Sequence, residues 1–233
     1  MKGKLYLVPV TLGHSDYSSV IPGGVLNIIN NLRRFLVEDI RSARRFLRMI
    51  NTGFPIDECE FIILNKHTSR EEYDEMLSGL AKGCDTGLMS EAGIPGVADP
   101  GSSLVLSAHM KGYRVIPLTG PSSIFLALMS SGLNGQDFAF NGYLPVKRAE
   151  RIKQIKKLEA IALRGQSQIF METPYRNMKI LHDLGTVLGA ETYLCIAAGI
   201  SHPDEYIVTR QVSEWLEKGF PDIDRKPAIF IIG

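Results

Sequence analysis

One segment of the chain gathers residue types that bind small ligands, Ser90-Glu91-Ala92-Gly93-Ile94-Pro95-Gly96-Val97-Ala98-Asp99-Pro100-Gly101. Its three glycines and two prolines predict a tight loop with exposed backbone amides and carbonyls. The carboxylates of Glu91 and Asp99 can accept hydrogen bonds from hydroxyl or amino groups. An ordinary turn-rich connection is the alternative interpretation. The density of small and rigid residues favours a binding loop.

Two shorter segments carry weaker signals. The loop Thr119-Gly120-Pro121-Ser122-Ser123 precedes a predicted helix, so Ser122 can cap that helix or the loop can present backbone amides to a ligand. The segment Glu172-Thr173-Pro174-Tyr175-Arg176 follows an apolar run and is typical of a helix start. Tyr175 and Arg176 in its first turn could also stack on a ligand or pair with it. For both segments the structural and the functional interpretation stay open.

Basic residues gather in two stretches. The first contains Arg33, Arg34, Arg41, Arg44, Arg45 and Arg48, and the second contains Lys147, Arg148, Arg151, Lys153, Lys156 and Lys157. A solvated helix face is the usual explanation of such runs, although guanidinium groups also bind phosphates in a bidentate manner. The formal net charge of the chain is only +1, so no global field attracts it to nucleic acid.

Several kinds of catalytic machinery are absent from the sequence. It contains no Gly-x-Gly-x-x-Gly, no phosphate-binding Gly-Lys-Ser/Thr and no Gly-x-Ser-x-Gly. The five histidines do not fall at metal-ligand spacing, and the three cysteines form no Cys-x-x-Cys pair, so no metal is expected. Unpaired cysteines and the lack of an 18-residue apolar run predict a cytoplasmic protein without a membrane segment.

The elements that must position these loops show a strand–helix rhythm in the first half of the chain. Strands are predicted at 5–8, 35–37, 61–64, 86–89 and 115–118, with helices between them. A capping box at Ser69-Arg70-Glu71-Glu72 marks the start of one helix. The strands are apolar throughout, which indicates a parallel sheet with helices on both faces. Loops at the carboxyl ends of such strands form the ligand crevice.

The second half has a different rhythm. A basic helix is expected at 148–164, and strands are expected at 138–140, 168–171, 193–196, 206–208 and 228–232. Strands that follow strands indicate a mixed sheet with antiparallel pairs. We therefore predict two α/β domains, an N-terminal domain at 1–117 with a parallel sheet and a C-terminal domain at 118–233 with a mixed sheet.

Taken together, the motifs resemble those of the tetrapyrrole methylase superfamily, and within it the ribosomal RNA small-subunit methyltransferase I branch. The similar segments are Leu5–Val8 with Gly13, Glu38-Asp39-Ile40-Arg41, Ser90–Gly101, Pro117–Ser123, Phe140–Pro145 and Glu172–Arg176. The sequence departs from the family pattern at Pro9–Ser15 and at Ala197–His202, where the family's Arg-Glu pair is missing. The chain thus resembles a divergent member of that branch.

The resemblance implies S-adenosylmethionine bound in a cleft between two α/β domains, in a protein that works as a homodimer. The cofactor-binding residues carried over are Ser90, Glu91, Ala92, Gly93, Pro95, Asp99, Gly120, Pro121, Ser122, Ser123, Met171 and Thr173. The residues expected to bind RNA are Arg41, Arg44, Arg45, Tyr175 and Arg176. Methyl transfer to a ribose hydroxyl needs a proton acceptor, and Asp39 or Glu91 is the hypothesis for that role.

Three functions follow as hypotheses. The first is 2′-O-ribose methylation of small-subunit ribosomal RNA by an S-adenosylmethionine-dependent methyltransferase, which the arginines around 33–48 favour. The second is methylation of a small metabolite such as a tetrapyrrole-like ring, with which the near-zero net charge agrees. The third is a non-catalytic cofactor- or RNA-binding protein on the same fold.

Overall fold

The computed structural model describes residues 2–13 and 16–233, apart from the side chain of Arg70, and the chain divides into two compact units, Met1–Ser122 and Ser123–Gly233. Each unit has its own sheet and its own buried apolar cluster or clusters.

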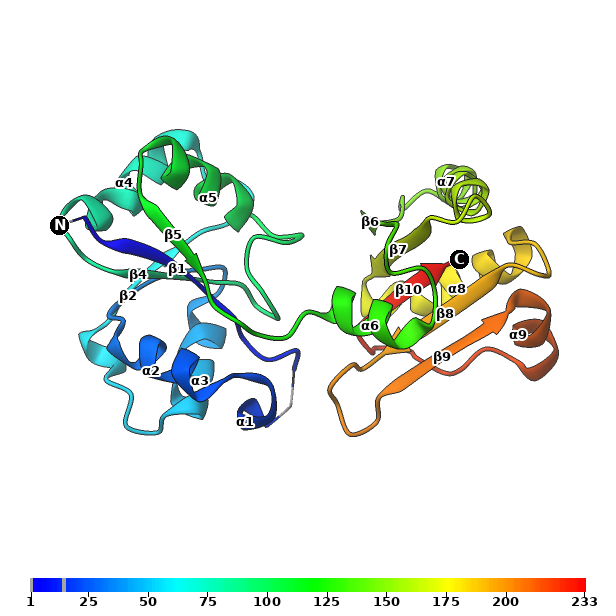
Figure 1. The fold of residues 1–233 in the computed structure, drawn as a ribbon, viewed down its shortest axis with the longest axis horizontal. Coiled ribbons are helices and arrows are strands. Elements are labelled where there is room, and N and C mark those ends of the chain that lie inside the picture. Colours follow the sequence, from blue (N-terminus) through cyan, green and yellow to red (C-terminus); the bar gives the residue numbers. More distant parts are fainter. Residues whose placement is uncertain (1, 14–15) are drawn as a thin grey trace. The chain divides into compact units, whose positions relative to one another are not determined.

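The first unit is built on a five-stranded sheet of order β3-β2-β4-β1-β5 in which every pairing is parallel (Figure 1). Its strands are β1 (Lys4–Val8), β2 (Arg34–Val37), β3 (Glu60–Ile63), β4 (Thr86–Met89) and β5 (Arg114–Pro117). Every residue of the inner strands β2 and β4 is buried, whereas the edge strands β3 and β5 are partly exposed. The prediction of a parallel sheet is confirmed.

Helices cover both faces of this sheet, as predicted. They are α1 (Tyr17–Val20), α2 (Gly23–Asn31), α3 (Ile40–Ile50), α4 (Arg70–Ala81) and α5 (Gly101–Met110), with a 3₁₀ turn at η1 (Ile56–Glu58). Figure 1 shows α2 and α3 on one face and α4 and α5 on the other. Side chains alternate along a strand, so Phe35 and Val37 pack toward α2 and α3 while Leu36 packs toward α4 and α5. The capping box at Ser69 is present, and α1 is a short helix that the sequence analysis did not predict.

The order of the strands creates a point of reversal in the sheet. The chain runs from β1 to β2 to β3 in one direction and returns through β4 to β5. Crossovers between parallel strands are right-handed, so the reversal moves the covering helices to the opposite face. The neighbours β2 and β4 therefore send their following helices, α3 and α5, to opposite faces. In open α/β sheets ligands bind outside the carboxyl ends of strands at such a point.

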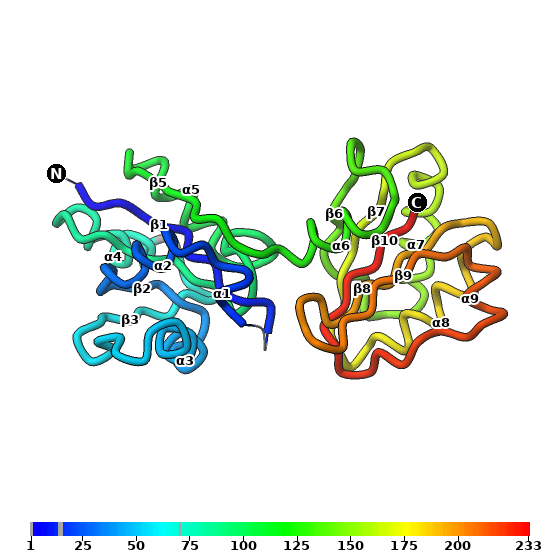
Figure 2. The backbone as a smooth tube through the Cα atoms, turned by 60° about the horizontal axis from the view of Figure 1, so that its bottom comes forward, coloured from blue at the N-terminus to red at the C-terminus, as the bar shows by residue number. Residues whose placement is uncertain are grey.

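The second unit contains the mixed sheet, of order β6-β7-β10-β8-β9, in which β6 and β7 are parallel and the other pairings are antiparallel. Its elements are α6 (Ser123–Ser131), β6 (Phe138–Tyr143), α7 (Arg148–Ala162), β7 (Ser167–Glu172), η2 (Pro174–Arg176), α8 (Asn177–Val187), β8 (Tyr193–Ala198), β9 (Tyr206–Gln211), α9 (Val212–Lys218) and β10 (Ala228–Ile232). Figure 2 shows β10 between β7 and β8. The prediction of a mixed sheet is confirmed.

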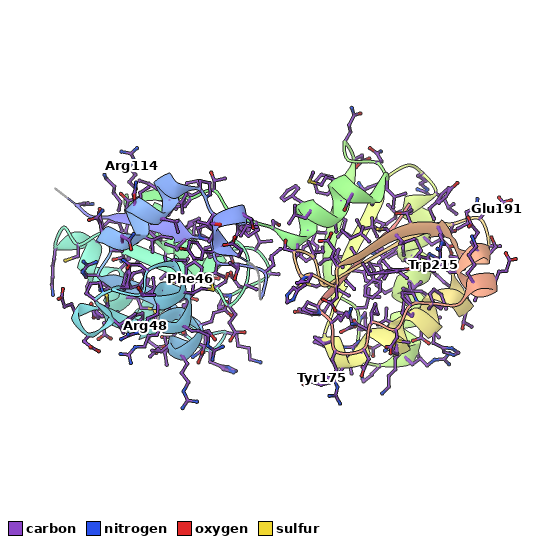
Figure 3. All side chains as sticks on the ribbon, turned by 90° about the horizontal axis from the view of Figure 1, so that it is seen from below. Phe46, Arg48, Arg114, Tyr175, Glu191 and Trp215 are labelled. Atoms are coloured by element: carbon purple, nitrogen blue, oxygen red, sulfur yellow. The ribbon has the colours of Figure 1, made fainter. Side chains whose placement is uncertain are left out.

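One apolar cluster fills the side of this sheet covered by α7, α8 and α9. Trp215 is fully buried in it (Figure 3), and its indole Nε1–H donates to the carbonyl oxygen of Leu194 at 2.9 Å. A buried indole needs such an acceptor, because an unpaired polar group in the core is costly. Helix α6 packs on β9 and β10, and the Thr209 hydroxyl donates to the carbonyl of Ser131 in that helix.

Candidate active site

The loops that follow β1 and β4 are joined at the carboxyl edge of the parallel sheet. The Val10 N–H donates to the Gly93 carbonyl oxygen at 2.9 Å, and the Gly93 N–H donates to the Thr11 carbonyl oxygen at 3.4 Å. These two bonds lie beyond the parallel ladder of β1 with β4, which ends at the pair Val8 and Met89. The loop at 90–101 is therefore held against the segment after β1 by its own backbone.

Glycines allow this close approach of the loops. Gly93 has a φ of +71°, and a Cβ there would lie 3.2 Å from the carbonyl oxygen of Pro121. A Cβ at Gly120 would overlap the ring of Pro9. Side chains other than hydrogen at these two positions would push the three loops apart.

Asp99 fixes the far half of the 90–101 loop. Its Oδ1 accepts the N–H of Gly101 at 2.7 Å, and its Oδ2 accepts the N–H of Gly96 at 2.8 Å. Burial raises the pKa of the Asp99 carboxyl, although the hydrogen bonds from Gly96 and Gly101 act in the opposite direction. Asp99 thus organises the loop and at the same time places a partly desolvated carboxylate at the end of the sheet.

Glu38 lies beside this loop, as the first residue after β2. Its Oε1 accepts the backbone N–H of Glu91 at 3.3 Å. Partial burial raises the pKa of the Glu38 carboxyl, and the nearby charges of Asp99 and Glu91 raise it further. Carboxylates with raised pKa values at the end of a sheet are typical of functional sites.

A hollow of about 640 Å³ opens beside these carboxylates. It lies where the chain leaves β2, β3 and β4, and its wall includes Glu38, Asn65, Lys66, Tyr73, Ser102 and Ser103 together with part of the 90–101 loop. The volume is within the range of pockets that hold small molecules or a single nucleotide. The hollow belongs entirely to the first unit.

The two carboxylates predicted as proton acceptors have different surroundings. Asp39 is the N-cap of α3, where its Oδ1 accepts the Ser42 N–H at 2.7 Å. This hydrogen bond lowers the pKa of Asp39, so its carboxylate is a weaker base than usual. Glu91 is exposed and lines the hollow through the loop. Glu38 was not among the proton acceptors predicted from the sequence, although the predicted strand end at Val37 makes it the next residue at the carboxyl edge.

The arginines of the first basic stretch separate into two kinds. Arg41, Arg44, Arg45 and Arg48 are exposed along α3, and the Arg44 guanidinium lies 5.3 Å from the centre of the Phe61 ring. Figure 3 shows Phe46 of the same helix within the unit. Within the part of the chain that the structure describes, none of these four forms an ion pair with a carboxylate. They are available to bind anions.

Arg34 does not belong with them, and counting it among phosphate-binding arginines was wrong. It is buried in β2, where its Nε donates to Glu60 Oε2 at 2.7 Å and its Nη1 donates to the carbonyl of Met76. A Cβ at Gly79 would lie 2.9 Å from its side chain, so α4 leaves room for it. Arg34 is a structural residue.

The predicted residues of the second unit lie around the end of β7. Met171 is within that strand, and Thr173 is the N-cap of η2. Tyr175 is 80% exposed and projects from the unit (Figure 3). Arg176 is half-buried, where its Nη2 lies 3.0 Å from Glu172 Oε2 and donates to the Leu144 carbonyl oxygen at 3.2 Å. Of these residues, Tyr175 has the most accessible side chain and Arg176 has a structural partner.

Across 2–13 and 16–233, no helix is both long and apolar enough to cross a membrane. Over the same ranges, no three His, Cys, Asp or Glu side chains are gathered as metal ligands. His14 and Ser15, in the segment that departs from the family pattern, lie outside the described residues.

No protein-family model matches the chain. Curated proteins do match it over most of its length. The ribosomal RNA small subunit methyltransferase I of Pseudomonas aeruginosa is 31% identical over 212 residues, which cover 91% of this chain and 71% of the relative. The protein of the same name from Haemophilus influenzae is 31% identical over 219 residues, covering 93% and 74%. That from Vibrio cholerae is 29% identical over 228 residues, covering 98% and 75%.

Solved structures with the same fold are more distant in sequence. The methyltransferase CobJ superposes with a TM-score of 0.65 at 16% identity, over 99% of this chain and 94% of that one. A uroporphyrin-III-C-methyltransferase from Thermus thermophilus superposes with a TM-score of 0.58 at 18% identity, over 100% and 93%.

Fold and relatives together define the class of protein. It is a methyltransferase with the two-domain α/β fold of the tetrapyrrole methylases. Within that class, the chain belongs to the ribosomal RNA small subunit methyltransferase I family.

Proposed function

We propose that this protein transfers a methyl group from S-adenosylmethionine to a ribose 2′-hydroxyl of small-subunit ribosomal RNA. The observation that carries the proposal is the joining of the 9–13 and 90–101 loops by the Val10 and Gly93 backbone bonds. These loops lie at the carboxyl edge of a parallel sheet, and the 90–101 loop is among the segments in which the chain resembles its family. The names of the curated relatives support ribosomal RNA as the substrate.

The residues present fit S-adenosylmethionine as cofactor. The cofactor carries a sulfonium and an ammonium group, and the carboxylates of Glu91 and Asp99 provide acidic surroundings for cations. The exposed Glu91 and the half-buried Ser90 provide acceptors for hydroxyl or amino groups. Bound there, S-adenosylmethionine supplies an electrophilic methyl group. The chain's own task is to align the acceptor and to exclude water.

Further cofactor contacts are proposed on the resemblance alone. They are Ala92, Gly93, Pro95, Gly120, Pro121, Ser122, Ser123, Met171 and Thr173. Gly93 and Gly120 have a defined role in the structure, since they let the loops pack without a Cβ. Substituting either glycine is therefore expected to affect cofactor binding through the shape of the loops.

RNA binding is proposed for α3. Arg41, Arg45 and Arg48 follow one another along the helix over roughly 10 Å, which allows contact with more than one phosphate. Arg44 adds a fourth exposed guanidinium. Tyr175 is a second proposed RNA contact, because exposed aromatic rings stack on unpaired bases. This set of arginines is what favours RNA over a small ring-shaped acceptor.

Titration calorimetry with S-adenosylhomocysteine tests the cofactor site. We expect the wild-type protein to bind at micromolar concentration and Gly120→Ala to bind at least tenfold more weakly. Gly24→Ala is the matched control, because Gly24 lies in α2 with open space around its Cα. Absence of binding by the wild-type protein at high ligand concentration would contradict the methyltransferase mechanism and favour a non-catalytic binding protein.

Methylation of small ribosomal subunits that lack the modification tests the acceptor. A 2′-O-methyl group blocks alkaline cleavage at the following phosphate, so methyl label should appear in alkali-resistant dinucleotides. Label in alkali-released mononucleotides would show methylation of a base instead. Label in tetrapyrrole precursors, with none in RNA, would support the small-metabolite alternative.

The homodimer stays a prediction of the family resemblance, and the cytoplasmic location stays a prediction from the unpaired cysteines and the lack of a long apolar run. Light scattering on the purified protein measures its mass in solution. A mass near twice the 25.8 kDa of the chain is expected.

A further inference from the structure

Among the carboxylates at the hollow, Glu38 is the one that is partly buried and has an oxygen without an internal donor. Asp99 uses both oxygens to hold its loop, through Gly96 and Gly101. Glu91 is exposed to water. Glu38 engages Oε1 with the Glu91 N–H, and within the described chain no donor contacts Oε2. The side chain lines the hollow and is accessible to a ligand there.

The charged groups around Glu38 make it a better base than an ordinary surface carboxylate. From the loop after β4, Asp99 and Glu91 add negative charge. From the loop after β3, Lys66 lines the same hollow, and from α4 Tyr73 does so. No cation is paired with Glu38 among the residues that the structure describes. Partial burial and the two acidic neighbours raise the pKa of Glu38, so it takes up a proton more readily.

The form of the hollow suits a nucleotide. Its volume of about 640 Å³ is sufficient for a base and its ribose. Its wall includes Asn65, Ser102 and Ser103 as hydrogen-bonding groups and Lys66 as a cation. The exposed arginines of α3 begin three residues after Glu38, with Arg41. A backbone held along α3 would therefore bring a nucleotide close to the hollow.

We propose that the hollow receives the acceptor nucleotide and that Glu38 takes up the proton of its ribose hydroxyl during methyl transfer. The hydroxyl oxygen forms the new bond to the methyl carbon, and the electron pair of the broken sulfur–carbon bond stays on sulfur. The hydroxyl proton passes to Oε2 of Glu38, and water later removes it. This inference rests on the proposed function and deepens it by assigning the proton acceptor and the acceptor pocket.

The Glu38→Gln variant tests the assignment. Glutamine keeps an oxygen that can accept the Glu91 N–H but cannot take up the proton. We expect the single-turnover rate to fall about 10²- to 10⁴-fold, with S-adenosylhomocysteine and RNA affinities within twofold of wild type. In the wild type the rate should rise with pH until Glu38 is fully ionised, and that limb should be absent in the variant.

A readout independent of activity is the infrared difference spectrum between wild type and Glu38→Gln during a pH titration without cofactor. We expect a carboxyl band that titrates above the ordinary range and shifts when an RNA oligonucleotide of the acceptor sequence is added. An oligonucleotide with a 2′-deoxy acceptor nucleotide should give a smaller shift. A Glu38 carboxyl band that titrates in the ordinary range of a glutamate and does not shift when RNA is added would overturn the inference.

Blocking the hollow gives a second variant. Ser103→Trp would fill it from the first turn of α5, so we expect loss of methyl transfer and weaker RNA binding with unchanged affinity for S-adenosylhomocysteine. Leu106→Trp is the matched control, because Leu106 is exposed on the same helix and does not line the hollow. Equal activity of Ser103→Trp and Leu106→Trp would overturn the acceptor pocket.

Asp39→Asn separates the two hypotheses for the proton acceptor. Asparagine also caps helices, so α3 should remain intact. Turnover lost in Asp39→Asn and kept in Glu38→Gln would return the role to Asp39 and overturn the inference. A wild-type protein that binds S-adenosylhomocysteine and yet methylates no ribosomal RNA would contradict the proposed function itself. The inference would then be overturned together with it.

Discussion

Glu38 in the first unit and Asp183 in the second are both carboxylates shielded from water, but the charged side chains near them have opposite signs. Asp183 is 2% exposed, with Arg151 Nη2 at 2.6 Å from Oδ2 and Arg148 Nε at 3.0 Å from Oδ1. Burial alone would raise the pKa of Asp183, but the hydrogen bonds and charges of the two arginines lower it. Glu38 has acidic neighbours instead, and its pKa is raised.

The difference shows which buried charge serves structure and which serves chemistry. An ion pair such as Asp183 with Arg151 fixes helices α7 and α8 together, and each partner stabilises the charged form of the other. A carboxylate without a cation destabilises the fold in its charged form, so its presence is more easily explained by activity. The same contrast separates Arg151, which is committed to Asp183, from Arg41, which forms no ion pair within the described residues.

The largest effect is expected from breaking the structural pair. Arg151→Ala leaves Asp183 buried without its main partner, and also removes donors to the carbonyls of Pro145 and Val146. We expect the free energy of unfolding to fall by about 3–5 kcal/mol. Thermal and urea denaturation measure the change. Lys153→Ala, exposed on the same helix, is the control and should change stability by less than about 0.5 kcal/mol. Equal effects of the two variants would contradict the structural role.

The next largest loss of stability is expected from Asp99. Like Asp183 it accepts internal hydrogen bonds, and like Glu38 it has a raised pKa. Asp99→Ala leaves the N–H groups of Gly96 and Gly101 without their acceptor. A loss of about 1–3 kcal/mol in stability is expected, together with weaker binding of S-adenosylhomocysteine because the loop loses its fixed form. Denaturation and calorimetry check the two parts. Full cofactor affinity in Asp99→Ala would show that the loop holds its form without this side chain.

A smaller effect is expected from the arginines of α3. Replacing Arg41 and Arg45 by alanine should weaken RNA binding, and the slope of log K against log salt should become less steep by about 0.7–0.9 for each lost phosphate contact. Filter binding over a range of salt concentrations measures this slope. Lys153→Ala with Lys156→Ala on α7 removes the same charge from the second basic stretch and is the control. If the α7 pair gave the larger change, RNA would bind the second unit instead.

The strands and the loops could be predicted from the sequence. Burial of a strand on both faces gives a continuous apolar run, and a tight turn gives a cluster of glycine and proline. Apolar runs such as Leu5–Val8 and Thr86–Met89 predicted strands of the parallel sheet, and Ser69 predicted the start of α4. These features depend on neighbours within a few residues, so they can be read without the tertiary structure.

The partners of charged side chains were not accessible in this way. Arg34 and Arg41 stand in one arginine-rich stretch, and only the pairing of β2 with β3 shows that Arg34 meets Glu60. Glu38 and Asp39 are adjacent carboxylates, and the Ser42 N–H decides which of them caps α3. That Asp99 lies near Glu38 depends on the parallel pairing of β2 with β4. Each distinction rests on contacts between residues distant in sequence.

The smallest predicted effect is the change in stability with pH when Glu38 or Asp183 is made neutral. It compares the two carboxylates directly, because it is measured without any ligand. The folded protein holds the pKa of Glu38 above its ordinary value of 4.5, so the native state disfavours the charged form. Below pH 4.5, where Glu38 is protonated in both states, wild type and Glu38→Gln should be equally stable. As the pH rises through the raised pKa of Glu38, the wild type loses stability relative to the variant. The glutamine variant should therefore be more stable at neutral pH, by less than about 1 kcal/mol because the group is only half-buried.

Asp183→Asn should show the opposite sign, because the pKa of Asp183 is lowered and its charged form is stabilised. Urea denaturation of both variants between pH 4 and pH 8 measures the two differences, and the same sign for both would contradict the contrast between a structural and a functional carboxylate.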